Sequence, residues 1–139
     1  MKVKIIIDSN VILSGLKSKN GYSYKLLELI PKNIFEIAIS VPLILEYELV
    51  LINNIKLLEL NKNDVENFID YICRVSKHTK IYYLWRPFLK DPYDDHLLEV
   101  AVASSSDYII TFNLKDFKGI EKFGIKTLTP KEFIKKIGV

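Results

Sequence analysis

Cysteine and histidine are scarce in this sequence. Cys73 is the single cysteine, so an intramolecular disulfide is impossible, which agrees with a reducing compartment. The two histidines, His78 and His96, are far apart and have no partner at the spacing of a zinc site or of a histidine-based triad. The sequence therefore argues against zinc and against catalysis by a cysteine or a Ser-His pair.

Long apolar runs are also missing. No stretch approaches the roughly 18 uninterrupted apolar residues of a membrane span. The N-terminal run MKVKIII is interrupted by Asp8 and has no small-residue cleavage site, so it predicts a strand rather than a signal peptide. We expect a soluble, cytoplasmic protein that has no membrane partner.

The size and composition are ordinary for a globular protein. The 139 residues are 49% hydrophobic and 27% charged, which predicts one domain over residues 1–139. The formal net charge of +3 suits a polyanionic partner such as a nucleic acid. This signal is weak, because nearly all of the 20 basic residues are lysines and a genome-wide composition bias produces the same pattern.

Strand patterns alternate with helix patterns along the chain. Val3–Ile7 is a continuous β-branched run, typical of a parallel strand buried on both faces. Further strands are expected at 34–39, 79–84, 108–112 and 126–128. Helices are expected at 24–30, 41–53, 97–104, from 63 or 64 and from 130, and a loop at 86–95. The alternation predicts an α/β fold: a three-layer α/β/α sandwich with a central, mostly parallel sheet of four to five strands.

Acidic residues cluster just after the predicted strands or in the loop before a helix. They are Asp8, Asp91, Asp94, Asp95 and Asp116. In open α/β sheets, ligands bind outside the carboxyl ends of the strands. The sequence therefore predicts a site at this edge of the sheet.

A further acid, Glu46, lies inside the apolar segment VPLILEYELVLI. Its neighbours along a helix, Leu43 and Val50, are apolar, so the carboxylate is expected to be partly buried. An uncompensated buried charge is costly, which predicts a cation or a hydrogen-bond partner. Glu48 has the same problem, and spacing does not decide between the two glutamates.

Each aspartate also has a purely structural explanation. Asp8 could cap the helix that follows it. Asp94 and Asp95 could be first-turn residues favoured by the helix dipole. Asp91, which precedes a proline, and Asp116 could be turn residues.

Several converging carboxylates would repel one another and raise their pKa values unless a cation lay among them. Oxygen ligands without soft ligands select Mg²⁺ or Mn²⁺. Such ions, in pairs about 3.5–4 Å apart, catalyse phosphoryl transfer by activating water, and no protein nucleophile is needed.

Three segments together resemble the PIN-domain family, and they cover essentially the whole chain: IIIDSNVILSGL, SVPLILEYELVL and DPYDDHLLEVAVASSSDYIITFNLKDF. Many members of this family are toxins of toxin–antitoxin pairs. The resemblance implies Mg²⁺- or Mn²⁺-dependent cleavage of single-stranded RNA, a cognate antitoxin protein and a homodimer.

The resemblance also implies a set of site residues. The catalytic and metal-binding acids fall on Asp8, Glu46, Asp95 and Asp116. Asn113 stands where related sequences often have Asp, so Asp116 is expected to supply that carboxylate instead. Within the Asp94–Asp95 pair, Asp94 rather than Asp95 could be the residue that faces inward. The supporting or alternative residues are Asn10, Asp91, Asp94, Thr111 and Asn113.

Basic and aromatic residues near the acidic loops give a less specific signal for RNA. Tyr82, Tyr83 and Trp85 could stack on bases, or they could pack in the core or in a dimer interface. The lysines and the arginine could hold phosphates, or they could simply be solvated. These candidate substrate-binding residues are Arg86, Lys90, Lys115 and Lys118.

Two other functions remain as alternatives. A phosphatase or receiver-type α/β protein also has Asp at the end of the first strand. The phosphatase needs a second carboxylate two residues on, where this chain has Asn10, and the receiver needs an Asp after a later central strand. The other alternative is a PIN-like module that binds RNA or protein without turnover.

Overall fold

The computed structural model describes residues 2–81, 88, 89 and 91–139. Its centre is an all-parallel sheet, in which the described residues form five strands in the order β3-β2-β1-β4-β5. This confirms the predicted α/β class and the parallel sheet. The strands are β1 (Val3–Ile7), β2 (Phe35–Ile39), β3 (Lys77–His78), β4 (Tyr108–Ile110) and β5 (Lys126–Leu128).

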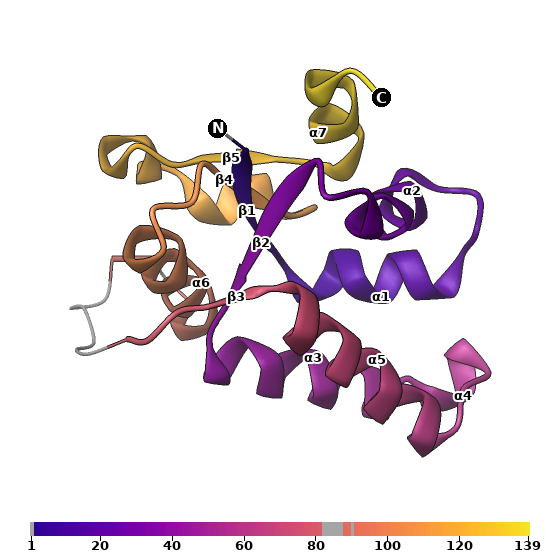
Figure 1. The fold of residues 1–139 in the computed structure, drawn as a ribbon. Helices are drawn as coiled ribbons and strands as arrows, with labels where there is room; N and C mark the ends of the chain where they lie inside the picture. The colour runs from indigo at the N-terminus through magenta and orange to yellow at the C-terminus, as the bar shows by residue number, and fades with distance from the viewer. Residues whose placement is uncertain (1, 82–87, 90) are drawn as a thin grey trace.

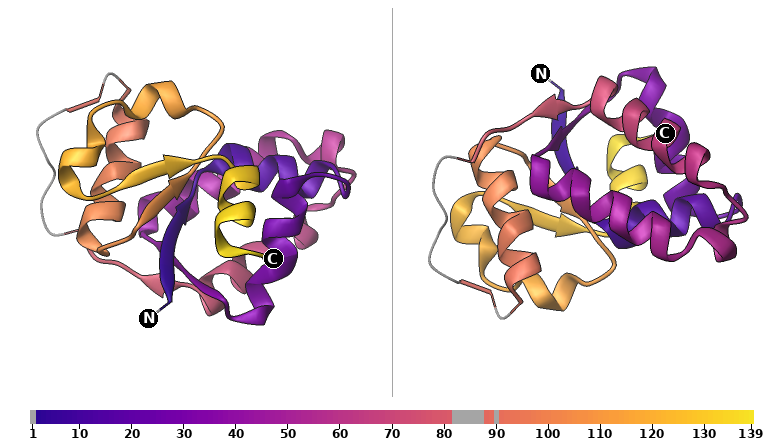
Figure 2. Two further views of the ribbon diagram at one scale, coloured as in Figure 1. Left: turned by 90° about the horizontal axis from the view of Figure 1, so that it is seen from above. Right: turned by 90° about the horizontal axis from the view of Figure 1, so that it is seen from below.

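Helices cover both faces of the sheet, which confirms the three-layer arrangement. One face is covered by α6 (Pro92–Ala103) and the other by α1 (Ser9–Lys17), α2 (Tyr22–Leu29) and α7 (Pro130–Ile137), as Figures 1 and 2 show. A group of three helices lies beyond the carboxyl ends of β1 and β2 (Figure 1). They are α3 (Val41–Asn53), α4 (Ile55–Leu58) and α5 (Lys62–Val75).

Strand β1 is the middle strand and the centre of the core. Its residues Ile5, Ile6 and Ile7 are buried, because β2 and β4 flank the strand and helices cover both faces. A continuous apolar run suits such a doubly covered strand. The next residue, Asp8, is also buried, so the end of β1 carries a carboxylate into the protein interior.

Helix starts follow the capping rules. The side chain of Ser40 accepts a hydrogen bond from the Leu43 amide and caps α3 at the predicted residue. Helix α5 starts at Lys62, slightly before the prediction, because Asn61 and Asp64 form a capping box. Asp64 is therefore the third residue of the helix rather than its start.

The predicted loop at 86–95 is too long. Helix α6 begins at Pro92 rather than at 97, with Asp91 as its N-cap, because proline is tolerated in the first turn of a helix. Asp94 and Asp95 are consequently helical residues.

Other elements also differ from the predictions. Strand β4 ends at Ile110 rather than at 112. In place of the strand expected at 79–84, β3 occupies Lys77–His78, and residues 82–84 lie outside the described residues. The short helix α4 was not expected from the sequence. The remaining short elements are the 3₁₀ helices η1 (Ile30–Lys32), η2 (Leu114–Phe117) and η3 (Ile120–Phe123).

No membrane-spanning candidate occurs among the helices of the described residues, all of which are too short or too polar to cross a bilayer.

Candidate functional site

The carboxyl ends of β1 and β4 bring Asp8 and Thr111 together. The strands pair in parallel with Ile7 beside Ile110, so the residues that follow them are also neighbours. The Asp8 amide donates to the Ile110 carbonyl at 2.9 Å. The Thr111 hydroxyl donates to Oδ2 of Asp8 at 2.7 Å. Sheet register therefore positions this pair.

The carboxylate of Asp8 does not cap α1. Asp8 occupies the N-cap position, but its side chain makes no capping hydrogen bond. Its Oδ1 instead accepts from the Tyr93 hydroxyl at 2.7 Å, while Oδ2 accepts from Thr111. Because this side chain is only 2% exposed, the hydroxyl groups of Tyr93 and Thr111 replace the hydrogen bonds of solvent. Helix capping therefore does not explain why a carboxylate is buried here.

Two chains of hydrogen bonds meet at Asp8. On the α6 side, the Ser9 hydroxyl lies 3.0 Å from the Tyr93 oxygen, and the Ser9 amide donates to that oxygen at 3.4 Å. Because Tyr93 gives its one proton to Asp8, Ser9 must be the donor in the hydroxyl pair. On the β4 side, the Asn113 amide donates to the Thr111 hydroxyl oxygen at 3.0 Å.

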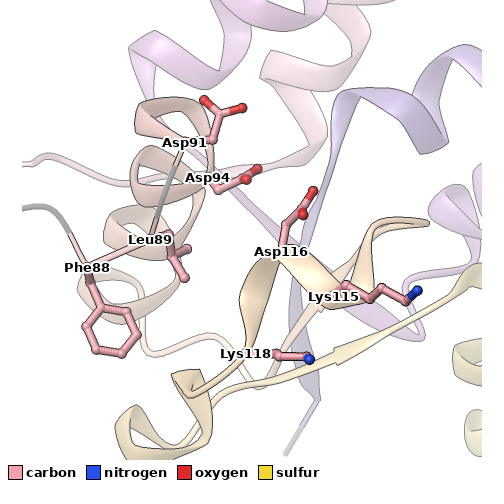
Figure 3. Close-up of a pocket in the computed structure, with 7 residues that line it drawn as sticks. All are labelled: Phe88, Leu89, Asp91, Asp94, Lys115, Asp116 and Lys118. Carbon is pink, nitrogen blue, oxygen red and sulfur yellow. The ribbon is translucent and has the colours of Figure 1, made fainter.

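A pocket of about 520 Å³ opens beside this network (Figure 3). Three aspartates contribute to its wall: Asp91 and Asp94 from the start of α6, and Asp116 from η2. Figure 3 shows the carboxylates of Asp94 and Asp116 as neighbours across the two elements. The full lining is Phe88, Leu89, Asp91, Asp94, Lys115, Asp116 and Lys118.

Asp94 is the most perturbed of these acids. Its side chain is only 5% exposed. Its pKa is raised to about 6, mainly by burial and to a lesser degree by the negative charges of Asp91, Asp116, Asp8 and Asp95. A carboxyl group with a raised pKa among other carboxylates is an electrostatically unfavourable arrangement that a cation would relieve.

Asp95 has a different environment from Asp94. Its Oδ1 accepts hydrogen bonds from the backbone amides of Phe88 at 3.0 Å and Leu89 at 2.7 Å. These bonds tie the segment before α6 to the first turn of the helix. The structure therefore places Asp94 in the pocket and engages Asp95 with the backbone.

Glu46 approaches α6 from α3. It is half-buried, as is Glu48 on the same helix. Burial lowers the pKa of His96 on α6, and the negative charges of Glu99 and Glu46 oppose this shift. Glu46 is therefore near His96. It is not among the described carboxylates whose charge raises the pKa of Asp94.

The supporting polar residues lie around the same edge. Asn10 is half-buried in α1, and its Oδ1 is buried without a hydrogen-bond partner among the described residues. Lys115 and Lys118 line the pocket, and Asn113 is exposed beside them. The other expected substrate contacts lie outside the described residues: Tyr82, Tyr83, Trp85, Arg86 and Lys90.

The acids do not form a preformed metal centre. Within residues 2–81, 88, 89 and 91–139, no three His, Cys, Asp or Glu side chains converge closely enough to hold an ion directly. Mg²⁺, however, usually keeps several waters and binds through one or two carboxylates. The oxygen-only donors around the pocket, together with the raised pKa of Asp94, fit a hydrated hard cation.

Sequence reasoning missed Tyr93 and Ser9. Tyr93 stands between acids in DPYDDH, and Ser9 directly follows Asp8, so both positions adjoin predicted site residues. Their contacts join distant segments: Tyr93 is 84 residues from Ser9 and 85 residues from Asp8 in the sequence. No local pattern reports such a contact.

Comparisons with known proteins agree with this architecture. A family model described as PIN domain matches residues 4–115. Among solved structures, a similar fold occurs in the crystal structure of VapBC2 from Rickettsia felis bound to a DNA fragment from their promoter. That match has a TM-score of 0.62 and 17% sequence identity, and it covers 91% of this chain and 99% of the other. A search of curated proteins finds no match.

Proposed function

Because the chain belongs to the PIN-domain family, we propose that it is a metal-dependent endoribonuclease that hydrolyses phosphodiester bonds of single-stranded RNA. The supporting observation is the buried Asp94 carboxyl group, which shares the carboxyl edge of the sheet with Asp8, Asp91 and Asp116. Such a group of acids is costly for a purely structural role, and it suits the binding of a divalent cation.

The residues proposed to hold hydrated Mg²⁺ or Mn²⁺, directly or through its bound waters, are Asp8, Asp94 and Asp116. Asp94 takes the place that the family resemblance assigned to Asp95, because Asp94 lines the pocket and Asp95 binds backbone amides. Glu46 is kept as a fourth acid that approaches from α3, on the His96 side of α6.

Residues of the chain would hold both the cation that activates water and the RNA. The bound cation would supply a water of lowered pKa and neutralise charge on the phosphate. Asp8 is held in one orientation by two hydroxyl donors. Lys115 and Lys118, on the opposite side of the pocket from α6 in Figure 3, offer positive charge to RNA phosphates.

The alternatives receive less support. The match to the PIN-domain family favours neither a phosphatase nor a receiver protein. A module that only binds RNA or protein would gain nothing from a buried carboxyl group surrounded by other carboxylates, which weakens the folded state. Such a module predicts no carboxylate-dependent stabilisation by Mn²⁺.

An exposed apolar stripe on α3 supports a protein partner. Val41, Leu45, Leu49 and Ile52 recur at helical spacing and are 73%, 59%, 56% and 40% exposed. Contiguous exposed apolar surface marks interaction sites. We propose that a second copy of the chain covers this stripe, since one apolar helix face can pack on itself about a two-fold axis.

The size of the protein in solution tests the homodimer. Light scattering during gel filtration should give a dimer for the wild type and a monomer for Leu45→Glu. Lys56→Glu, a charge change at an exposed α4 position, is the control and should stay dimeric. A monomeric wild type would overturn the proposed homodimer.

We further propose that the chain is the toxin of a toxin–antitoxin pair, with a cognate antitoxin protein as a second partner. This rests on the family and on the similar fold seen in VapBC2. Expression of the chain alone should arrest growth of a bacterial host. Expression of Asp8→Asn at the same level should not, and equal growth in both strains would contradict the toxin role.

RNA cleavage is the direct test of the enzyme. Purified protein is incubated with mixed single-stranded RNAs and Mn²⁺ or Mg²⁺, with EDTA in a parallel reaction. Wild type should cleave, whereas Asp8→Asn and the EDTA reaction should not. Asp107→Asn is the matched control, because Asp107 is exposed and accepts from the Lys4 amide before β4 begins. Equal cleavage by wild type and Asp8→Asn would overturn the proposal.

A further inference from the structure

The hydroxyl of Tyr93 connects α6 to the end of β1. We propose that Tyr93 is a positioning residue, which orients the Asp8 carboxylate for the cation by donating a hydrogen bond to its Oδ1. The inference rests on the proposed function, because it assigns Asp8 to a metal site. It adds a residue outside the acid set to the machinery of that site.

The geometry of Asp8 carries the argument. Oδ1 accepts from Tyr93 and Oδ2 accepts from Thr111, each at 2.7 Å, so rotation of the carboxylate would break both bonds. A carboxylate oxygen has two lone-pair sites, so each oxygen keeps one for a cation or its water. Two donors on opposite oxygens therefore fix the plane of the carboxylate without closing it to a ligand.

The position of Tyr93 is itself well determined. Its backbone amide donates to Oδ1 of Asp91 at 3.0 Å, which places it in the first turn of α6. Its ring stacks on His96, with 6.2 Å between centroids and 22° between planes. Its oxygen accepts from Ser9, which begins α1.

An ordinary tyrosine hydroxyl is protonated at neutral pH, so Tyr93 has one proton to donate to Asp8. The donor and acceptor capacity of the phenol is therefore used in full.

Tyr93 also links two acids from different elements. Asp94 follows it in α6, and Asp8 ends β1. A hydrogen bond from the residue beside Asp94 to Asp8 sets the spacing between the helix and the strand at the pocket. Tyr47 provides a contrast, because its hydroxyl donates its one proton to the backbone carbonyl of Ile7 rather than to a carboxylate.

The experiment measures Mn²⁺ affinity by calorimetric titration of the metal-free protein, together with its melting temperature. Tyr93→Phe keeps the ring and removes the hydroxyl. Removal of a residue that orients a metal ligand typically weakens affinity about 10–100-fold, and we expect about 10-fold here. The matched control is Tyr108→Phe, because Tyr108 is also half-buried but packs against Phe133. Its Mn²⁺ affinity should equal that of the wild type.

Variants of the other donor and of Ser9 make the test specific for hydroxyl groups. Thr111→Val should weaken Mn²⁺ binding, whereas Thr111→Ser, which keeps the hydroxyl, should restore it. If Tyr93→Phe does not fold, Ser9→Ala tests the same series of hydrogen bonds, from Ser9 through Tyr93 to Asp8. This variant should weaken Mn²⁺ binding several-fold.

The outcomes separate this inference from the proposed function. If Asp8→Asn loses Mn²⁺ binding but Tyr93→Phe binds as tightly as the wild type, the positioning role is wrong and the metal site stands. A lower melting temperature with unchanged Mn²⁺ affinity would likewise show a merely structural tyrosine. If the wild type shows no saturable Mn²⁺ binding, both proposals are overturned.

Discussion

The two ends of the sheet carry hollows of similar size that differ in the number and burial of their acids. The pocket at the carboxyl ends has a volume of about 520 Å³, and the hollow at the amino ends of β1 and β2 has about 550 Å³. At the amino ends, Glu36 is accompanied by Lys2 and Lys77. At the carboxyl ends, three aspartates share the wall with Lys115 and Lys118, and one of these aspartates, Asp94, is buried.

This difference shows that composition, rather than size, identifies the candidate site. At the amino ends, Glu36 is the one acid of the described lining and has two lysines beside it, as ordinary surface charges do. At the carboxyl ends the pKa of Asp94 is raised to about 6 by burial and by the neighbouring carboxylates. A perturbed acid in a pocket is a candidate functional group, and the proposed cation would relieve the repulsion among these carboxylates.

The largest expected effect is the difference in RNA cleavage between a variant that lacks a carboxylate at the carboxyl ends and one that lacks a carboxylate at the amino ends. Asp94→Asn should lower Mn²⁺-dependent RNA cleavage at least about 100-fold, because it removes a proposed ligand of the ion. Glu36→Gln, at the amino ends, should stay within about twofold of the wild type. Initial rates of cleavage at saturating Mn²⁺ measure both. Equal losses would erase the functional difference between the two hollows.

A second effect distinguishes Asp95 from Asp94. Asp95→Ala leaves the amides of Phe88 and Leu89 without their acceptor, so it should destabilise the protein by about 1–3 kcal/mol. Mn²⁺ affinity of the folded variant should change little, because its carboxylate does not line the pocket. Urea denaturation and metal titration measure the two quantities. A large loss of Mn²⁺ affinity at unchanged stability would return the ligand role to Asp95.

The smallest effect is the pH dependence of the metal-free protein. The pKa of Asp94 is raised from 3.8 to about 6, so between these values the folded state holds a proton that the unfolded chain releases. This group therefore favours folding below pH 4, and its contribution is lost as the pH rises through 6. Asp94→Asn removes the dependence, so its melting temperature relative to the wild type should increase from pH 4.5 to 7.

A control variant and a measurement with Mn²⁺ accompany this experiment. Asp107→Asn, an exposed acid before β4, should follow the wild-type pH profile. Saturating Mn²⁺ should remove the difference at pH 7, because the cation favours the ionised form of Asp94. A constant difference between Asp94→Asn and wild type across this pH range would contradict the raised pKa.

Much of the fold was predictable because its signals are local. The apolar run of β1, the Ser40 cap with Pro42 in α3 and the start of α7 at Pro130 all depend on residues close in sequence. The start of α6 was missed because Pro92 resembles a helix breaker, although it occupies the first turn.

The sequence by itself determined that acids follow the strands of a parallel α/β sheet, because hydrophobic periodicity sets the strands and their ends. Only the tertiary structure decided where the side chains of those acids lie. Successive helical residues point about 100° apart, so Asp94 and Asp95 cannot both face the pocket, and packing of α6 on the sheet selects Asp94. The Asp8 carboxylate accepts hydrogen bonds from Tyr93 in α6 and from Thr111 after β4. Both residues are distant from Asp8 in the sequence, so they meet it only because the chain has folded.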